Sequence, residues 1–361
     1  MSAPAYATPE MAVSAVTAAS AVASNSTLAA SAPAVAIPTE PVAPHIALLL
    51  PLKSAAYTKA ADAVKQGFLA AASKEIDGLP VRIYSCADED KEVVALYQQA
   101  LTNGAVAVAG PLTRGGVAAL AMNASLMTPT LALNVIDSTR SDQLYFFGLP
   151  PESEARQSAL LATAAGLRTI TLVSTNTALS KRLVQAFADE WQRAGGVIQS
   201  EITYTNDPNP LKALALDPGN AVFMAAELDK ARLLRPYINN TLPVYATSQA
   251  FSGNTNTLTN YDLADVHFVD MPWLLQPDHP AVMIYPRATP ALELERERLY
   301  ALGIDAYRLL QILFEHGMTN ALPLDGVTGK ITLTGHLFQR EAAPAVFKQG
   351  VAVVSESKVR P

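Results

Sequence analysis

Six polar residues stand near the ends of predicted buried strands, at places where a protein can hold a small molecule. They are Tyr57, Thr113, Arg114, Asn134, Ser248 and Gln249. Their hydroxyl, amide and guanidinium groups form hydrogen bonds that are made and released without a chemical step. These residue types therefore predict a site for a small polar ligand in the cleft between two lobes, and they include no candidate catalytic residue.

One glycine-rich stretch shows how such residues would be positioned. Residues 105–109 form an apolar run typical of a buried parallel strand, and Gly110–Pro111 ends it sharply. The loop around Thr113 leads into a predicted helix at 117–126, and a strand follows at 130–133. The loop of this βαβ unit lies at the carboxyl end of a strand, where open α/β sheets bind their ligands.

Strands and helices alternate through the first half of the chain. The pattern predicts strands at 45–50, 81–86 and 105–109, helices at 58–73 and 91–102, and a further strand at 145–149. Such alternation predicts a parallel sheet with helices on both faces. The loops 51–57 and 110–116 should then meet at one edge of the sheet, and Asn134 should join them.

The same alternation restarts after residue 149. We expect a helix with Ser153 as its N-cap and a second helix capped by Ser180, with Leu183, Phe187 and Trp191 on its buried face. Further strands are predicted at 169–174, 198–204, 221–225 and 244–247, with a helix at 229–238. The fold class is therefore α/β, with two doubly wound parallel-sheet lobes.

The last third of the chain returns to both lobes. A long helix at 293–315 is predicted to be buried on much of its surface. Shorter strands are predicted at 266–270 and 351–354, and residues 324–333 are predicted to form a turn and a strand. We assign residues 44–148 plus about 274–330 to the first lobe, and 149–273 plus about 331–361 to the second. Residues 1–43 are rich in Ala, Ser and Pro and are expected to form a disordered tether.

Composition excludes several classes of protein. Hydrophobic residues make up 50% of the 361 residues and charged residues 16%, with a net charge of −6. The chain shows no basic stripe, so we expect no nucleic-acid partner. Ser, Thr and Asn interrupt the apolar run of residues 1–43 too often for a membrane span, so we expect no direct span.

The residue types that usually carry catalysis or metals are scattered. The five histidines (His45, His267, His279, His316 and His336) never stand four apart, which argues against a metal site. Cys86 is the single cysteine and has no histidine near it in sequence. The run Asp88, Glu89 and Asp90 is typical of a solvated loop, and Glu293, Glu295 and Glu297 should spread around a helix. We predict no enzyme, no cofactor and no metal.

Several motifs taken together resemble a known family. HIALLLPL at 45–52, QGFLAA at 66–71, VAVAGPL at 106–112 and PTLALN at 129–134 are similar to type I periplasmic binding proteins. Five further motifs resemble the carboxy-terminal domain of the penicillin-binding-protein activator lipoproteins: FFGLPPESEARQSA (146–159), LPVYATSQAFSG (242–253), FVDMPWLL (268–275), RLYALGIDAYRL (298–309) and LDGVTGKITL (324–333).

The resemblance implies a non-enzymatic regulator. Members of that family are outer-membrane lipoproteins that reach through the periplasm and stimulate a class A penicillin-binding protein, a bifunctional peptidoglycan synthase. It also implies a role in regulating peptidoglycan synthesis, the cell wall and cell shape. Longer members carry an amino-terminal helical-repeat domain, where this sequence has its Ala/Ser/Pro-rich stretch, and their lipid-bearing cysteine is not in this sequence.

A second function stays open on the same fold. A solute-binding protein would close on an amino acid or a cell-wall fragment, held by the six polar residues named at the outset. A shift of the thermal unfolding midpoint by such a ligand, without contact to a synthase, would favour this alternative.

Overall fold

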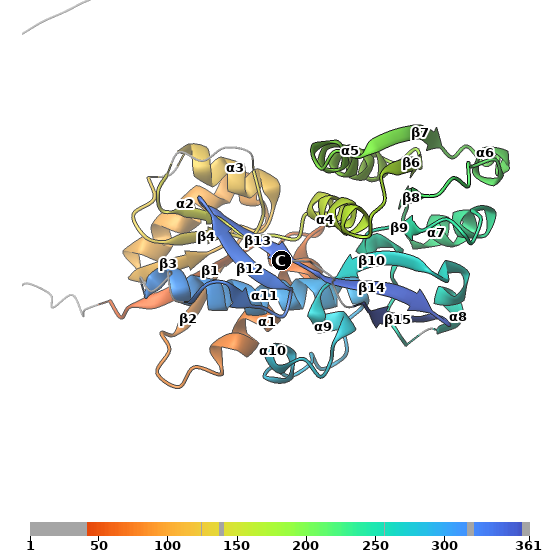
Figure 1. Cartoon of the computed structure of the whole chain (residues 1–361). Coiled ribbons are helices and arrows are strands. Elements are labelled where there is room, and N and C mark those ends of the chain that lie inside the picture. Colours follow the sequence, from red (N-terminus) through yellow and green to blue (C-terminus); the bar gives the residue numbers. More distant parts are fainter. Residues whose placement is uncertain (1–41, 124, 137–140, 256, 316–320, 356–361) are drawn as a thin grey trace, which may run out of the picture. The chain divides into compact units, whose positions relative to one another are not determined.

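The computed structural model describes residues 42–355, apart from residues 124, 137–140, 256 and 316–320 (Figure 1). Most of the predicted tether, residues 1–41, and His316 lie outside the described residues. None of the helices in the described part combines the length and the apolar character that a bilayer crossing requires.

The first sheet is built mainly from the amino-terminal part of the chain. It contains β1 (His45–Leu50), β2 (Val81–Ser85), β3 (Ala105–Ala109), β4 (Thr130–Ala132), β5 (Leu144–Phe146), β11 (Leu324–Asp325), β12 (Lys330–Thr334) and β13 (Leu337–Glu341). The described strands are hydrogen-bonded in the order β11-β12-β13-β5-β4-β3-β1-β2. The five strands β1 to β5 run parallel, as the alternating pattern predicts.

Helices cover this sheet on two faces because successive side chains of a strand point to opposite sides. Ile46, Leu48 and Leu50 of β1 belong to the core under α1 (Thr58–Ala72) and α11 (Leu294–Phe314). Ala47 and Leu49 belong to the core under α2 (Glu89–Thr102) and α3 (Arg114–Asn123). The predicted long helix is thus confirmed as α11, and it is buried along most of its length.

The helices α1 and α11 approach each other closely at two glycines. A Cβ atom on Gly67 would lie 1.9 Å from the carbonyl oxygen of Tyr300, and one on Gly303 would lie 2.1 Å from that of Val64. Phe68 and Tyr307 then meet edge to face at 5.2 Å between ring centroids. This contact attaches α11, which comes late in the chain, to the first helix of the fold.

The second sheet repeats the same plan. It contains β6 (Thr169–Ser174), β7 (Val197–Thr203), β8 (Asn220–Ala225), β9 (Val244–Tyr245), β10 (Val266–Asp270), β14 (Ala343–Lys348) and β15 (Val351–Val354), in the order β15-β14-β10-β9-β8-β6-β7. The helices α4 (Pro151–Ala164) and α5 (Ala178–Arg193) pack side by side over one face, as Figure 1 shows. The other face carries a core with α7 (Leu228–Leu234).

Short helical segments complete the chain. They are α6 (Asn209–Lys212), η1 (Arg235–Tyr237), η2 (Ser248–Ala250), α8 (Thr257–Asn260), η3 (Tyr261–Leu263), α9 (Pro272–Leu275) and α10 (Pro280–Met283).

Two predicted helix caps were wrong. The helix α4 begins at Pro151, so Pro150 is its N-cap and Ser153 lies inside its first turn. In α5 the N-cap is Thr177, whose hydroxyl accepts a hydrogen bond from the Ser180 N–H at 3.1 Å. Proline is well suited to a first helical turn because it needs no N–H donor there, which explains the earlier start of α4.

The two-lobe α/β architecture is confirmed, but each sheet also carries antiparallel strands at one edge. The pairs β11–β12, β12–β13, β10–β14 and β14–β15 are antiparallel. Strands β13 and β14 were not predicted. The strand expected at the end of residues 324–333 is confirmed as β12, and the turn expected before it also carries the two-residue strand β11. β12 and β13 also pair within the first sheet, although the expected boundary near residue 330 placed them in the second lobe. The crossing to the second sheet comes between β13 and β14, where only Ala342 separates the strands.

Candidate functional site

Both sheets have the same strand order around their first strand, and this order defines where a ligand could sit. In the first sheet β2 and β3 flank β1, and in the second sheet β7 and β8 flank β6. The chain therefore turns to opposite sides after the first strand, and the crevice at such a switch point is where open α/β sheets bind ligands. The loops at these two edges are the candidate sites.

At the edge of the first sheet, the buried carboxylate of Glu89, the first residue of α2, binds the loop after β3. One oxygen of Glu89 accepts a hydrogen bond from the Leu112 N–H at 3.0 Å, and the other accepts from the Thr113 N–H at 2.6 Å. Glu89 is 3% exposed. The two N–H groups that could have bound a solute anion therefore already have an acceptor from the protein itself.

The prediction that residues 88–90 form only a solvated loop was wrong. Asp88 caps α2 by accepting from the Asp90 N–H at 3.2 Å, while Glu89 turns into the protein. Burial raises the pKa of the Glu89 carboxyl, and the backbone N–H of Leu112 and the hydroxyl and N–H of Thr113 oppose that rise.

Two of the sequence-predicted residues meet at this loop. Thr113 donates its N–H to Glu89, and the Asn134 side chain donates to the Leu112 carbonyl oxygen at 3.1 Å. Arg114 is exposed as the first residue of α3, and Tyr57, which is 49% exposed, is the N-cap of α1. The Thr113 hydroxyl also accepts from the Gly116 N–H at 3.1 Å, so the side chains of Thr113 and Asn134 both already form hydrogen bonds within this loop region.

Ser248 and Gln249 lie elsewhere, in the short helix η2. Ser248 is 2% exposed, its N–H donates to Glu154 at 3.1 Å, and its carbonyl oxygen accepts from Arg298 at 3.2 Å. Gln249 beside it is half-buried. In the described part of the chain, no hydrogen bond joins Ser248 or Gln249 to Thr113 or Asn134.

Ser248 belongs to a buried charged network at the crossings between the sheets. Arg298 of α11 pairs with Asp270 at the end of β10 at 2.6 Å, and Arg340 of β13 pairs with Glu154 of α4. All four side chains are almost fully buried. Burial opposes the charge on Arg298, but the carboxylates of Asp270, Glu295 and Glu154 together outweigh burial and raise the pKa of the guanidinium. Each pair links an element of the first sheet to one of the second.

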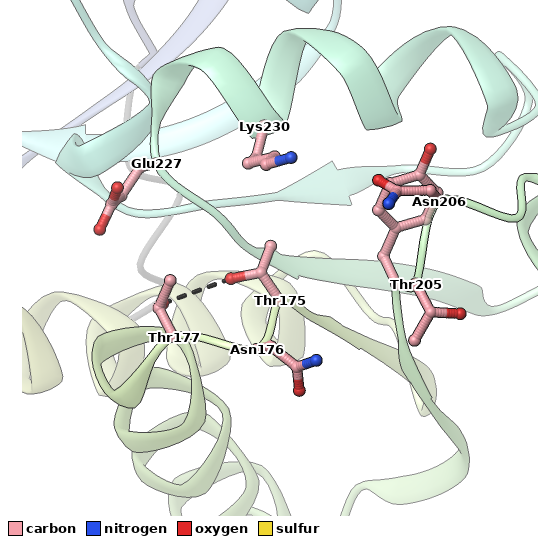
Figure 2. Close-up of a pocket in the computed structure, with 8 residues that line it drawn as sticks. Thr175, Asn176, Thr177, Thr205, Asn206, Glu227 and Lys230 are labelled. Atoms are coloured by element: carbon pink, nitrogen blue, oxygen red, sulfur yellow. Dashed lines mark hydrogen bonds between the residues drawn. The ribbon is translucent and has the colours of Figure 1, made fainter.

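The switch point of the second sheet holds a pocket of about 370 Å³ (Figure 2). Thr175, Asn176 and Thr177 follow β6, and Tyr204, Thr205 and Asn206 follow β7. Glu227 and Lys230 line it from the start of α7. In Figure 2 Lys230 extends over the pocket toward the side where Asn206 lies.

The six sequence-predicted residues do not include any that line this pocket. The sequence did contain a signal for this pocket. Three polar residues follow β6 directly, and three more follow its neighbour β7. We placed the helix cap at Ser180 and assigned residues 175–177 to no site, whereas Thr177 is the residue that caps α5. The same residues therefore serve both as the cap of a helix and as a pocket wall.

The cysteine and the glutamates that could support catalysis are either buried or bonded to neighbouring side chains. Burial raises the pKa of the Cys86 thiol to about 11, so the thiolate nucleophile is disfavoured at neutral pH. Glu297 accepts from the Trp273 indole at 2.6 Å, while Glu293 and Glu295 pair with Arg296 and Arg298, so the three acids diverge as predicted. Within the described ranges, no group of histidine, cysteine and carboxylate side chains could hold a metal ion.

A family model named "LppC putative lipoprotein" matches residues 39–217 and 217–350, which is most of the chain. The chain belongs to the LppC family. This agrees with the predicted resemblance, because curated proteins similar to this chain are named penicillin-binding protein activators. A Pasteurella multocida (strain Pm70) protein named "Penicillin-binding protein activator LpoA" is 28% identical over 80% of this chain. This LppC-family chain spans about half the length of the curated relatives it matches, and 50% of that one.

Solved structures show the same fold as this LppC-family chain. A structure described as the LpoA (YraM) C-domain from Haemophilus influenzae, a regulator of PBP1A, has a TM-score of 0.73 and 25% identity. The match covers 86% of this chain and 99% of that domain. A second structure, of "a putative branched-chain amino acid ABC transporter" from Chromobacterium violaceum, has a TM-score of 0.74 and 38% identity, and the match covers 84% of this chain and all of that one.

Proposed function

We propose that the chain is a non-enzymatic regulator that binds and stimulates a class A penicillin-binding protein, the bifunctional synthase of peptidoglycan. The observation that carries the proposal is the match to the C-domain described as a regulator of PBP1A, which the chain covers almost end to end. The names of the curated relatives support the same role. The family description supports a periplasmic place of action at the outer membrane.

The first-sheet edge supports action by contact rather than by solute binding. A binding protein for an anionic solute needs free N–H donors at this loop, and here Glu89 takes two of them. The charged pairs at the crossings connect the two sheets through buried groups. A regulator that presents a fixed surface to a partner would shift the partner's conformational equilibrium by binding one state more tightly.

The proposal is tested with the purified chain and purified class A synthases. We expect the chain to be retained by an immobilised synthase and to raise its rate of glycan polymerisation or peptide cross-linking. A monofunctional transpeptidase serves as the control partner. Absence of both retention and stimulation with every class A synthase of the source organism would reject the proposal.

Solute binding is the second candidate, and the second-sheet pocket favours it. The likeness to the Chromobacterium violaceum structure gives it further support. A separate proposed place for an amino acid or cell-wall fragment is the cleft between the lobes, with contacts from residues that do not line this pocket: Tyr57, Thr113, Arg114, Asn134, Ser248 and Gln249. Alanine variants of these residues would bind such a ligand more weakly, and the ligand would then raise the thermal unfolding midpoint by less than it does in the parent chain.

A further inference from the structure

The second-sheet pocket differs from the first-sheet edge because most of its polar side chains form no hydrogen bond with the rest of the described chain. Asn176, Tyr204, Asn206 and Lys230 make no side-chain hydrogen bond or ion pair with another residue of the described part. The Thr175 and Thr177 hydroxyls lie 3.3 Å apart and bond only to each other and to the Ser180 N–H. Three loops therefore line one cavity, and four of the lining side chains have no hydrogen-bond partner in the described part of the chain.

The pocket wall is held in place by groups behind it. The Ser180 hydroxyl accepts from the Thr175 N–H at 2.8 Å and donates to the Ala225 carbonyl oxygen at 2.5 Å, which joins the loop after β6 to the end of β8. The Tyr204 N–H donates to the Ser174 carbonyl oxygen at 2.8 Å, which joins the loop after β7 to β6. A site that is already organised loses less free energy on ordering when a ligand binds.

The chemistry of the lining selects a class of ligand. Hydroxyl and amide groups both donate and accept, as do the hydroxyl groups of a sugar. One acid, Glu227, and one base, Lys230, leave the lining without net charge, which disfavours a strongly anionic or cationic ligand. No leucine, isoleucine, valine or methionine is among the lining residues, so the apolar surface of the pocket comes from threonine methyl groups, the Lys230 stem and the Tyr204 ring, and such mixed surface suits the faces of a sugar ring better than a branched aliphatic side chain.

We propose that this pocket binds a saccharide, and that the second sheet does so alone. Its volume of about 370 Å³ suits a small ligand, since ligand pockets span roughly 300–1,000 Å³. Tyr204 contributes the one aromatic ring of the lining. The first sheet contributes no anion-binding loop because Glu89 already fills it. The proposal is independent of synthase activation.

The probe is N-acetylglucosamine, which carries both hydroxyl and amide groups, with leucine and glutamate as comparison ligands. Binding to the full chain is followed by ligand-observed NMR and by calorimetric titration. The test variants are Asn176→Ala and Lys230→Met, which change exposed side chains. Lys181→Met, an exposed lysine of α5 outside the pocket lining, is the matched control.

We expect saturable binding of N-acetylglucosamine at millimolar concentration, weakened at least tenfold in both test variants and unchanged in the control. Unfolding midpoints equal to that of the parent chain would show that the variants are folded. Absence of binding, or equal binding by all variants, would overturn the proposal, and so would pocket-dependent binding of leucine in place of the sugar. Synthase stimulation is measured on the same samples and should not change, so failure of either proposal is seen separately.

Discussion

Removal of the Glu89 side chain should release the loop after β3. The carboxylate accepts from the Leu112 and Thr113 N–H groups at 3.0 and 2.6 Å in a buried place. A buried donor left without an acceptor costs about 1–3 kcal/mol. Two donors lose their acceptor in Glu89→Ala, but the cost of burying the carboxylate disappears with it, so we expect a net loss of about 2–3 kcal/mol.

The isosteric variant separates the acceptor from the charge. Glu89→Gln keeps one carbonyl oxygen that can accept from the loop, so its cost should stay below about 1 kcal/mol. Glu201→Gln, at an exposed position of β7, is the control for loss of a surface carboxylate. Hydrogen exchange of the peptide that covers residues 110–117 reports on the loop directly, and urea unfolding reports on the whole.

The pH dependence gives a second readout on the same variants. Burial raises the pKa of Glu89 above its ordinary value of 4.5, so the folded chain binds this proton more tightly than the unfolded chain. The parent chain therefore loses this part of its stability as pH rises from 4.5 through the raised pKa, whereas Glu89→Ala does not. The cost of Glu89→Ala should be larger at pH 4 than at pH 7.

Unchanged exchange of the loop in Glu89→Ala, together with unchanged urea unfolding, would refute this reasoning. It would mean that Leu112 and Thr113 find other acceptors. Faster exchange in Glu89→Gln, equal to that in Glu89→Ala, would show that the charge rather than the acceptor geometry holds the loop.

Three further outcomes follow from buried groups elsewhere. Arg298→Met leaves the Asp270 carboxylate buried without its cation, so urea unfolding should show a loss of about 3–5 kcal/mol, and the double variant with Asp270→Leu should recover part of it. His267, whose pKa burial lowers from 6.5, is protonated first in the unfolded chain, so thermal stability should fall as pH drops below 6.5, with a shallower slope in His267→Gln. Gly303→Ala places a Cβ atom 2.1 Å from the Val64 carbonyl oxygen, so forcing α11 away from α1 should cost at least about 1–3 kcal/mol in calorimetry, and an unchanged midpoint would contradict the close contact.

Periodicity was enough to predict the framework of both sheets. The apolar runs of β1, β3, β6, β10 and β15 match the predicted strands to the residue. Leu183, Phe187 and Trp191 of α5 are buried as their four-residue spacing indicates. The loops after β1 and β3 were also predicted to lie at neighbouring strand ends, and the order β2-β1-β3 places them there.

The sequence could not reveal which groups fill those loops. Glu89 stands between two other acids, a pattern typical of a solvent-exposed loop. Its hydrogen bonds to Leu112 and Thr113 join the start of α2 to the loop after β3, and this contact between distant parts of the chain leaves no local pattern in the sequence. The antiparallel strand β13 (LFQRE) was missed because three of its five residues are polar, and β14 (APAVFK) was missed because Pro344 argues against a strand. The second-sheet pocket was missed because cap residues and binding residues are the same types, Thr and Asn.

The central proposal is that this LppC-family chain acts on a peptidoglycan synthase by contact. The most direct measurement is the rate of glycan polymerisation and cross-linking by a purified class A synthase from the same organism, with and without an equimolar amount of the chain. The account predicts a faster rate that saturates with added chain, and no turnover by the chain alone. A rate that does not change while the chain binds no synthase, or synthesis or hydrolysis of peptidoglycan by the chain itself, would contradict it.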